Sequence, residues 1–249
     1  MKSLVSVVVP FFNEEANVPL LAARIADVFA AMPDHDLECL FVNDGSTDGT
    51  RTAIDEAAAR DARVRPVHLA RNQGQSAALV AGMRRARGEY IITLDGDLQN
   101  DPADIPRILA LLQSHDCVCG YREKRRDNWL RRLPSRAGNW VFRKALGVAV
   151  RDAGCGLKGF RRRCVEHVLP FNGVHRFFAV MMYMGGMTLA ECPVQHHPRL
   201  HGRSKYGIGN RLWRVLYDLI GVGWLQRRYL ICEVEGAQVS QPPDNNGEP

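Results

Sequence analysis

Runs of β-branched and apolar residues alternate with helical patterns through the first half of the chain, and this alternation limits the possible folds more than any other feature. The runs with strand character are Val5–Val9, Leu37–Val42, Val64–Leu69, Tyr90–Leu94 and Cys117–Tyr121. The patterns with helical character are 13–29, 51–60, 76–86 and 104–113, the first capped by Asn13, Glu14 and Glu15. Strands and helices that alternate through short connections form a parallel sheet covered by helices on both faces. We therefore predict an α/β fold with a mostly parallel, Rossmann-like sheet.

Polar loops follow the predicted strands. They comprise residues 10–14, 43–48, 71–74 and 95–99. Ligands of such sheets bind beyond the carboxyl ends of the strands, so we expect these loops to meet at one rim and form the functional site. The chain contains neither a G-x-G-x-x-G after its first strand nor a G-x-x-x-x-G-K-[ST]. These absences disfavour a dinucleotide-dependent redox enzyme and a P-loop NTPase.

The stretch YIITLDGDLQNDP, residues 90–102, ends a buried strand on two carboxylates that flank a glycine. Gly96 permits a tight turn that keeps Asp95 and Asp97 near one point, where their repulsion favours a bound cation. Mg²⁺ or Mn²⁺ binds through one or two carboxylates plus phosphate oxygens, which suits this turn. The alternative is a solvated turn in which Asp101 and the following proline cap the next helix.

Positive charge is concentrated in the second half of the chain. The net charge is +6, and residues 122–144 hold nine Lys and Arg against two Asp and Glu. Five more basic residues lie between positions 199 and 214. Such surfaces favour phosphate-bearing partners, namely nucleotides, nucleic acid or an anionic membrane. Because the clusters lack the interleaved aromatics of a single-strand platform, we expect no nucleic-acid partner.

Compartment and membrane topology follow from three sequence features. The seven cysteines are scattered without a C-x-x-C motif, which predicts reduced, buried thiols in a cytosolic protein. The N-terminus enters a strand directly, so no signal peptide is expected. No apolar run reaches the roughly 18 charge-free residues of a spanning helix. The best candidate, 212–225, is interrupted by Arg214 and Asp218.

After residue 121 the alternation ends. Residues 129–146 form an amphipathic pattern with arginine opposite tryptophan and leucine, typical of an interfacial helix or of the cationic face of an ordinary one. We further expect a glycine-rich loop at 151–157, a helix at 160–168, an apolar packing segment or acyl-chain groove at 177–184, an edge strand at 188–196 and a second amphipathic helix at 208–228. The predicted domains are a catalytic domain at 1–207 that includes the basic segment 125–146, a juxtamembrane amphipathic helix at 208–230 and a disordered tail at 233–249.

Five segments together resemble the inverting family 2 glycosyltransferases, which have a GT-A fold: VVVPFFNEE, VNDGSTDGT, RNQGQSAALVAGM, GEYIITLDGDLQNDP and HPRLHGRSKYG. The similarity is closest to the polyprenyl-phosphate branch, with its dolichol-phosphate mannose synthases and bacterial undecaprenyl-phosphate sugar transferases. It covers about residues 3–228, and D-G-D-L-Q followed by G-R-S-K-Y is its most specific part. The sequence departs from many relatives at Phe12, where they have tyrosine. It also lacks the transmembrane helices of many bacterial relatives, which leaves the mode of anchoring open.

The resemblance implies roles for particular residues. Nucleotide-sugar binding would involve Pro10, Glu14, Val42, Asp44, Asp95, Gly96, Asp97, Gln99 and Arg122. The metal, Mg²⁺ or Mn²⁺, would be held by Asp95, Asp97 and Gln99. The catalytic residues would be Asp97, Arg122, Arg203 and Lys205. The acceptor phosphate would be bound by Arg131, Arg136, Arg203 and Lys205.

The implied reaction moves one sugar from a UDP- or GDP-sugar to polyprenyl (undecaprenyl) phosphate, with inversion. The protein would act peripherally at the cytoplasmic face of the inner membrane. It would work alone, as a homo-oligomer or together with a membrane protein. A lipid monophosphate is already largely a dianion and needs cations rather than a general base. The main alternative is a soluble transferase acting on a saccharide or protein hydroxyl, which needs a base. Asp152 is the best candidate for that base, although a structural role in its loop is favoured. A non-catalytic nucleotide- or nucleic-acid-binding module is the third possibility.

Overall fold

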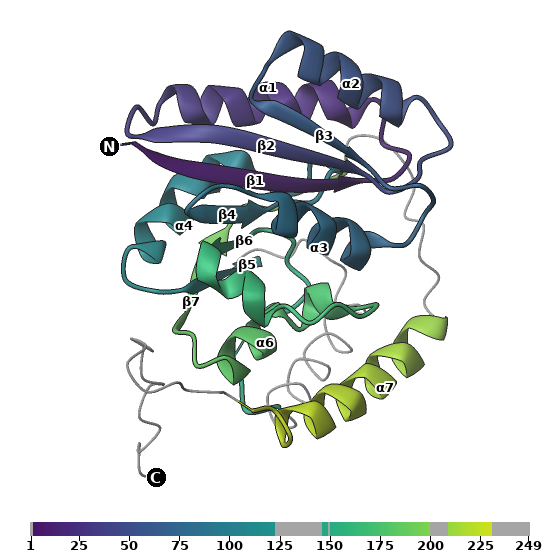
Figure 1. Cartoon of the computed structure of the whole chain (residues 1–249), viewed down its shortest axis with the longest axis vertical. Helices are drawn as coiled ribbons and strands as arrows, with labels where there is room; N and C mark the ends of the chain where they lie inside the picture. The colour runs from purple at the N-terminus through teal and green to yellow at the C-terminus, as the bar shows by residue number, and fades with distance from the viewer. Residues whose placement is uncertain (1, 123–145, 149, 200–208, 231–249) are drawn as a thin grey trace.

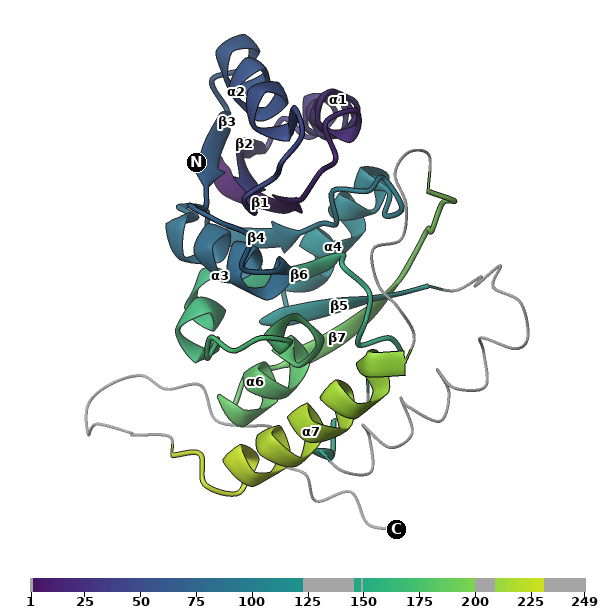
Figure 2. The same ribbon diagram turned by 90° about the vertical axis from the view of Figure 1, so that its right-hand side faces the viewer.

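The computed structural model describes residues 2–122, 146–148, 150–199 and 209–230. Its elements in chain order are β1 (Ser3–Phe11), α1 (Asn17–Ala30), β2 (His35–Asn43), α2 (Thr50–Arg60), β3 (Val64–His68), α3 (Gln75–Arg85), β4 (Tyr90–Thr93), η1 (Pro102–Asp104), α4 (Ile105–Leu112), β5 (Cys117–Arg122), β6 (Lys158–Arg161), η2 (Arg162–His167), η3 (Val174–Arg176), α6 (Phe178–Met184), β7 (Leu189–Val194) and α7 (Gly209–Gln226), where η marks a 3₁₀ turn. The strands form one seven-stranded sheet in the order β3-β2-β1-β4-β6-β5-β7 (Figures 1 and 2).

The sheet is mostly parallel, as predicted. β1 pairs in parallel with β2 and β4, β2 with β3, and β5 with β7, whereas β6 pairs antiparallel with β4 and β5. The predicted edge strand with a proline is confirmed, because β7 ends the sheet and contains Pro193.

The helix predicted for residues 160–168 is wrong. Residues 158–161 form strand β6, and a 3₁₀ turn follows at 162–167. Side chains of α4 explain the difference, since a Cβ on Gly159 would overlap Ile108 and lie 2.9 Å from Leu112. The glycine lets α4 pack directly on β6, and pairing with β4 and β5 then outweighs the local helical pattern.

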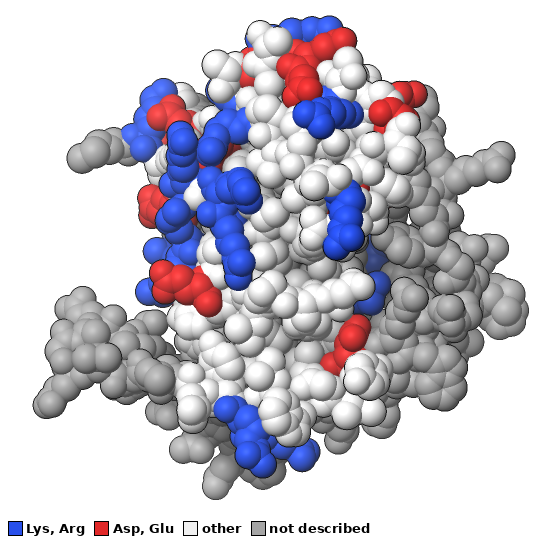
Figure 3. All heavy atoms as spheres, turned by 45° about the vertical axis from the view of Figure 1, so that its right-hand side comes forward, with Lys and Arg blue, Asp and Glu red and all other residues white. Residues whose placement is uncertain are grey.

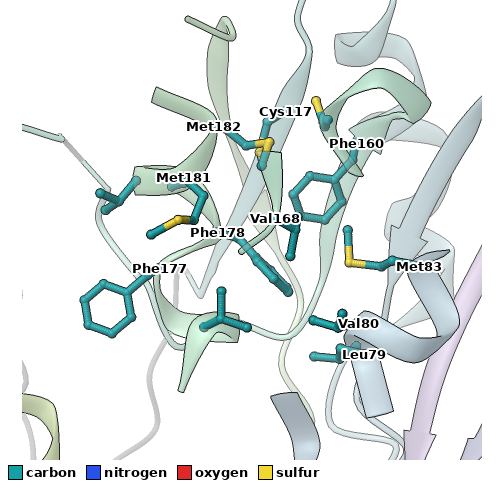
Figure 4. Close-up of a cluster of buried hydrophobic side chains, with 14 of the residues drawn as sticks. Leu79, Val80, Met83, Cys117, Phe160, Val168, Phe177, Phe178, Met181 and Met182 are labelled. Atoms are coloured by element: carbon teal, nitrogen blue, oxygen red, sulfur yellow. The ribbon is translucent and has the colours of Figure 1, made fainter. Parts of the chain in front are cut away.

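Helices cover both faces of the sheet, and each face has its own core. The apolar residues of α1, α2 and α4 pack on one face, and those of α3, α6 and α7 pack on the other. Figure 4 shows part of the second core, where Phe160 of β6 meets Phe178 of α6 edge to face, with ring centroids 5.6 Å apart. The aromatic and methionine-rich stretch 177–184 is therefore a packing segment, in agreement with the first of its two interpretations.

The loop after β1 is fixed by the loop after β2 rather than by a helix cap. The predicted cap at residues 13–15 is wrong, because α1 begins at Asn17 without any side-chain cap bond. Instead Asn13 adopts a left-handed conformation, with φ of 53°. Its Oδ1 accepts the backbone N–H of Thr47 at 2.8 Å, and the N–H of Glu14 donates to Thr50 Oγ1 at 2.8 Å. These bonds hold two of the predicted rim loops against each other.

The C-terminal helix α7 agrees closely with the helix predicted at 208–228. Within the described ranges, no helix combines the length and the apolar character that crossing a bilayer requires. The six cysteines that the structure describes are all buried and free, as predicted for reduced thiols. The basic segment 125–146, apart from its last residue, and the tail 233–249 lie outside the described residues.

Candidate functional site

A pocket of about 670 Å³ lies at the carboxyl ends of β1, β2, β3 and β4. This volume falls within the range of small-molecule sites. The predicted site residues that line it are Pro10, Glu14, Asp44, Asp95, Gly96, Asp97, Gln99 and Arg122. The side chain of Val42 is instead fully buried in the core between the sheet and α3. The remaining predicted residues, Arg131, Arg136, Arg203 and Lys205, lie outside the described part of the chain.

Asp44 holds the loop after β3 against one end of the pocket. Its carboxylate accepts the backbone N–H groups of Gln73 and Gly74 at 2.7 and 2.9 Å, and the side-chain amide of Asn72 at 3.1 Å. Burial raises the pKa of Asp44, whereas the two backbone N–H groups lower it. The next residue, Gly45, has φ of 62° and lies so close to the backbone of this loop that a Cβ would overlap it. Asp44 therefore shapes the pocket wall, a role that sequence reasoning did not anticipate.

Asp95 lies at the floor of the pocket. The Gln75 side-chain amide donates to its Oδ1 at 2.7 Å. On the other side Gly156 is so near that a Cβ there would overlap the carboxylate. Burial raises the pKa of Asp95 to about 6, with a further contribution from the negative charge of Asp97 and opposition from nearby cations, Lys158 first. The two carboxylates of the acidic turn are thus close enough to repel each other, as the sequence predicted.

Asp97 lies nearer the mouth, with 18% of its side chain exposed. Its Oδ1 accepts the backbone N–H of Gln99 at 3.2 Å. The described residues contain no group of three or more His, Cys, Asp or Glu side chains that could hold a metal. Two carboxylates and an amide oxygen nevertheless form a hard donor set of the kind that Mg²⁺ or Mn²⁺ completes with phosphate oxygens. The mutual repulsion at Asp95 also favours a cation, so the residues present fit such a metal.

Asp101, the third carboxylate of the acidic stretch, caps the following 3₁₀ turn, in agreement with the alternative interpretation of this residue. Its Oδ1 accepts the N–H of Ala103 at 3.0 Å, and its Oδ2 lies 2.8 Å from His197 Nε2. Asp101 therefore has a structural position, distinct from that of Asp95 and Asp97.

Cationic side chains also line the pocket, among them Arg122 and Lys158. Asp152 holds the Arg122 guanidinium through two contacts, from Nε at 2.6 Å and Nη2 at 2.9 Å. Lys158 is buried and donates to the backbone oxygens of Ala153 and Cys155, which fixes the glycine-rich loop beneath Asp95. Asp152 thus orients Arg122, consistent with the structural role favoured from the sequence.

Three further residues line this pocket; His175 and Arg176 were not predicted as site residues, and Arg199 was expected only as one of the cations of the late basic loop. Arg199 contacts both Glu14 and Asp97. His175 and Arg176 also line the pocket, and His175 Nδ1 lies 2.7 Å from the hydroxyl of Ser76. Ser76 in turn accepts the N–H of Gly173 at 2.9 Å, which ties η3 to the start of α3.

The profile of glycosyl transferase family 2 matches residues 6–169. The dodecaprenyl-phosphate galacturonate synthase of Rhizobium johnstonii is 40% identical over 230 residues, covering 89% of this chain and 67% of that protein. The undecaprenyl-phosphate 4-deoxy-4-formamido-L-arabinose transferase of Aeromonas hydrophila subsp. hydrophila is 38% identical over 219 residues, covering 87% and 67%. This chain therefore spans about two thirds of the length of these relatives.

Solved structures show the same fold at lower identity. Glucosyl-3-phosphoglycerate synthase from Mycobacterium tuberculosis, in complex with Mn²⁺, UDP-glucose and phosphoglyceric acid, superposes with a TM-score of 0.65 at 18% identity, covering 96% of this chain and 84% of that one. A mannosyltransferase from Pyrobaculum calidifontis, in complex with GDP-mannose and Mn²⁺, has a TM-score of 0.62 at 19% identity, covering 92% and 65%. These neighbours confirm the predicted GT-A fold. The chain belongs to glycosyl transferase family 2, and it is a glycosyltransferase.

Proposed function

We propose that this protein transfers a single sugar from a nucleotide-diphosphate-sugar to a polyprenyl phosphate, such as undecaprenyl phosphate, with inversion at the anomeric carbon. Two relatives, at 40% and 38% identity, carry names that describe sugar transfer onto dodecaprenyl or undecaprenyl phosphate. The product would serve cell-envelope glycan synthesis or lipid modification. The nucleotide would be a uridine or guanosine diphosphate.

The position of Asp152 is the observation that carries this proposal. A hydroxyl acceptor needs a positioned general base, whereas a phosphate dianion needs cations. Both oxygens of Asp152 are engaged by Arg122 at 2.6 and 2.9 Å, so the carboxylate best placed in the sequence to be a base serves instead to orient a cation. Arg122 lines the pocket together with Lys158 and Arg176, which suits an acceptor that brings its own negative charge.

On this proposal the donor binds with its diphosphate at the acidic turn. Asp95, Asp97 and Gln99 would hold Mg²⁺ or Mn²⁺, which supplies Lewis-acid stabilisation to the departing nucleoside diphosphate. Arg122 would add guanidinium donors to the same developing charge, because its fork geometry suits phosphate oxygens. Pro10, Glu14 and Asp44 would surround the base and ribose, whereas Val42 would support this end of the pocket only from the core.

The acceptor phosphate would meet further cations from the basic segments. Arg131, Arg136, Arg203 and Lys205 are the proposed acceptor residues, and Arg203 and Lys205 would also act in catalysis with Asp97 and Arg122. Their support is the similarity of their sequence segments to the polyprenyl-phosphate branch and the need to neutralise a second phosphate. In-line attack by the phosphate oxygen would then form the glycosyl phosphate bond as the bond to the nucleotide breaks.

A peripheral position at the cytoplasmic face of the inner membrane is part of the proposal, and α7 supports it. Leu219 and Val222 of α7 are buried against the core. Other apolar side chains of the helix are exposed, namely Tyr217 at 79%, Ile220 at 74% and Trp224 at 63%. In the lower part of Figure 3, where α7 lies in Figures 1 and 2, uncharged surface borders a group of Lys and Arg. An apolar face with tryptophan beside basic residues suits the headgroup region of an anionic bilayer.

The test is transfer of labelled sugar into an organic-extractable product. The protein would receive undecaprenyl phosphate, Mg²⁺ or Mn²⁺, and in turn UDP-galacturonate, UDP-4-deoxy-4-formamido-L-arabinose, UDP-glucose and GDP-mannose. We expect metal-dependent label in the organic phase with one donor, loss of that label in Asp97→Asn, and its retention in the matched control Asp101→Asn. Donor turnover only onto a soluble acceptor would favour the hydroxyl-directed transferase, and retained transfer in Asp97→Asn would refute the metal assignment.

A further inference from the structure

Arg199 lies in the acidic part of the pocket. It follows β7 and is therefore far in the sequence from Asp97 and the acidic turn after β4. Its Nη2 is 2.8 Å from Glu14 Oε1 and 3.3 Å from Asp97 Oδ2. One guanidinium group therefore joins a residue of the β1 loop to a residue of the β4 turn. Glu14 is proposed to bind the ribose and Asp97 the metal. The positive charge of Arg199 therefore lies where the metal cation and the negatively charged diphosphate would bind.

The contacts of Arg199 satisfy only part of its guanidinium. The side chain is 25% exposed, but its Nε is buried and donates no hydrogen bond within the described residues. A buried N–H without an acceptor costs free energy, and an arriving phosphate oxygen would supply that acceptor. The charge of Arg199 also helps to lower the pKa of Asp95, after Lys158 and Arg122. The guanidinium thus neutralises the acidic turn while retaining an unused donor.

We propose that Arg199 is a donor-binding residue that exchanges partners when the metal and the donor bind. Before they bind, it holds Glu14 and Asp97 together and offsets their repulsion. A divalent cation at Asp97 takes over that neutralisation, and the guanidinium then binds a phosphate oxygen of the donor through the donors it has released. This inference rests on the proposed metal–diphosphate site, but it does not depend on the acceptor.

The exchange predicts effects of opposite sign in a single variant, Arg199→Gln. Mn²⁺ alone no longer competes with a guanidinium at Asp97, so it should bind about fivefold to tenfold more tightly than to the unaltered protein. UDP or GDP in saturating Mn²⁺ loses a phosphate contact, so it should bind about tenfold more weakly. Free Mn²⁺ would be followed by electron paramagnetic resonance and nucleotide binding by calorimetry. The matched control is Arg151→Gln, which removes an exposed arginine paired with Glu191 and should change neither affinity.

Unchanged or weaker Mn²⁺ binding by Arg199→Gln would overturn the inference, as would tighter binding of both Mn²⁺ and nucleotide, which would make Arg199 a simple obstruction. A second measurement uses the unaltered protein: the Arg199 Nε–H resonance, identified as the signal missing from Arg199→Lys, should shift on addition of Mg²⁺ alone. An unmoved resonance at saturating Mg²⁺ would equally contradict the exchange. Neither experiment contains an acceptor, so failure here and failure of lipid-phosphate transfer are separate results.

Discussion

Asp95→Asn should stabilise the metal-free protein at neutral pH. Burial and the charge of Asp97 raise the pKa of Asp95 from about 3.8 to about 6 in the folded state. Between these values the folded protein binds more protons than the unfolded chain, so its stability falls as the pH rises through this window. A shift of roughly two units corresponds to about 3 kcal/mol at most. Asp95 keeps part of its surface open to the pocket, so we expect the variant to gain about 1–2 kcal/mol at pH 7.5.

Urea unfolding in the presence of a chelator measures this gain. The difference between Asp95→Asn and the unaltered protein should be largest at pH 7.5, should shrink as the pH falls below about 6, and should approach zero only below about pH 3.8, where the carboxyl becomes protonated in both states. Asparagine can still accept the bond from Gln75, so little else changes. The matched control is Asp27→Asn, which removes an exposed carboxylate of α1 outside the pocket. Destabilisation by Asp95→Asn at pH 7.5, or a gain that is independent of pH, would refute the argument that burial and Asp97 oppose the charge of Asp95.

Three further predictions concern other parts of the molecule. Gly45→Ala places a Cβ against the loop backbone at a residue with φ of 62°. It should lower the free energy of unfolding, measured with urea, by about 2 kcal/mol or more, and it should weaken nucleotide binding, measured by calorimetry. Asp152→Asn releases Arg122 and should slow transfer by about tenfold without loss of fold; an unchanged rate would refute the orienting role. Trp224→Ser should reduce flotation with anionic vesicles but leave urea unfolding unchanged, since this side chain is 63% exposed. Equal flotation would remove α7 as the membrane contact.

Local patterns in the sequence were sufficient to predict the sheet and the position of the pocket. The β-branched and apolar runs of β1, β2 and β4 are buried on both faces, so they could be recognised as strands without any tertiary information. The rim loops follow those strands directly, so their meeting point was determined once the sheet was known to be parallel. The paired carboxylates Asp95 and Asp97 were evident because they flank a glycine that permits a tight turn at the end of a buried strand.

What the sequence did not reveal depends on contacts between distant segments. Arg199 and Glu14 are 185 positions apart, and nothing near either residue indicates the other. β6 is short, and its strand state comes from pairing with β4 and β5 where Gly159 admits α4. Asn13 is a residue type that often caps helices, but its side chain instead accepts a hydrogen bond from Thr47 in the loop after β2. In each case a tertiary partner outweighs a local propensity, and a single sequence carries no signal for that partner.

The central claim is that the acceptor is a phosphate and needs no protein base. The most direct test compares undecaprenyl phosphate with undecaprenol, which has the same chain and a hydroxyl in place of the phosphate, under the donor and metal that support turnover. We expect labelled product from the phosphate alone, with the sugar released by mild acid, as is typical of a glycosyl phosphate. Equal transfer to undecaprenol, or a product whose sugar is not released by mild acid, would contradict a phosphate acceptor.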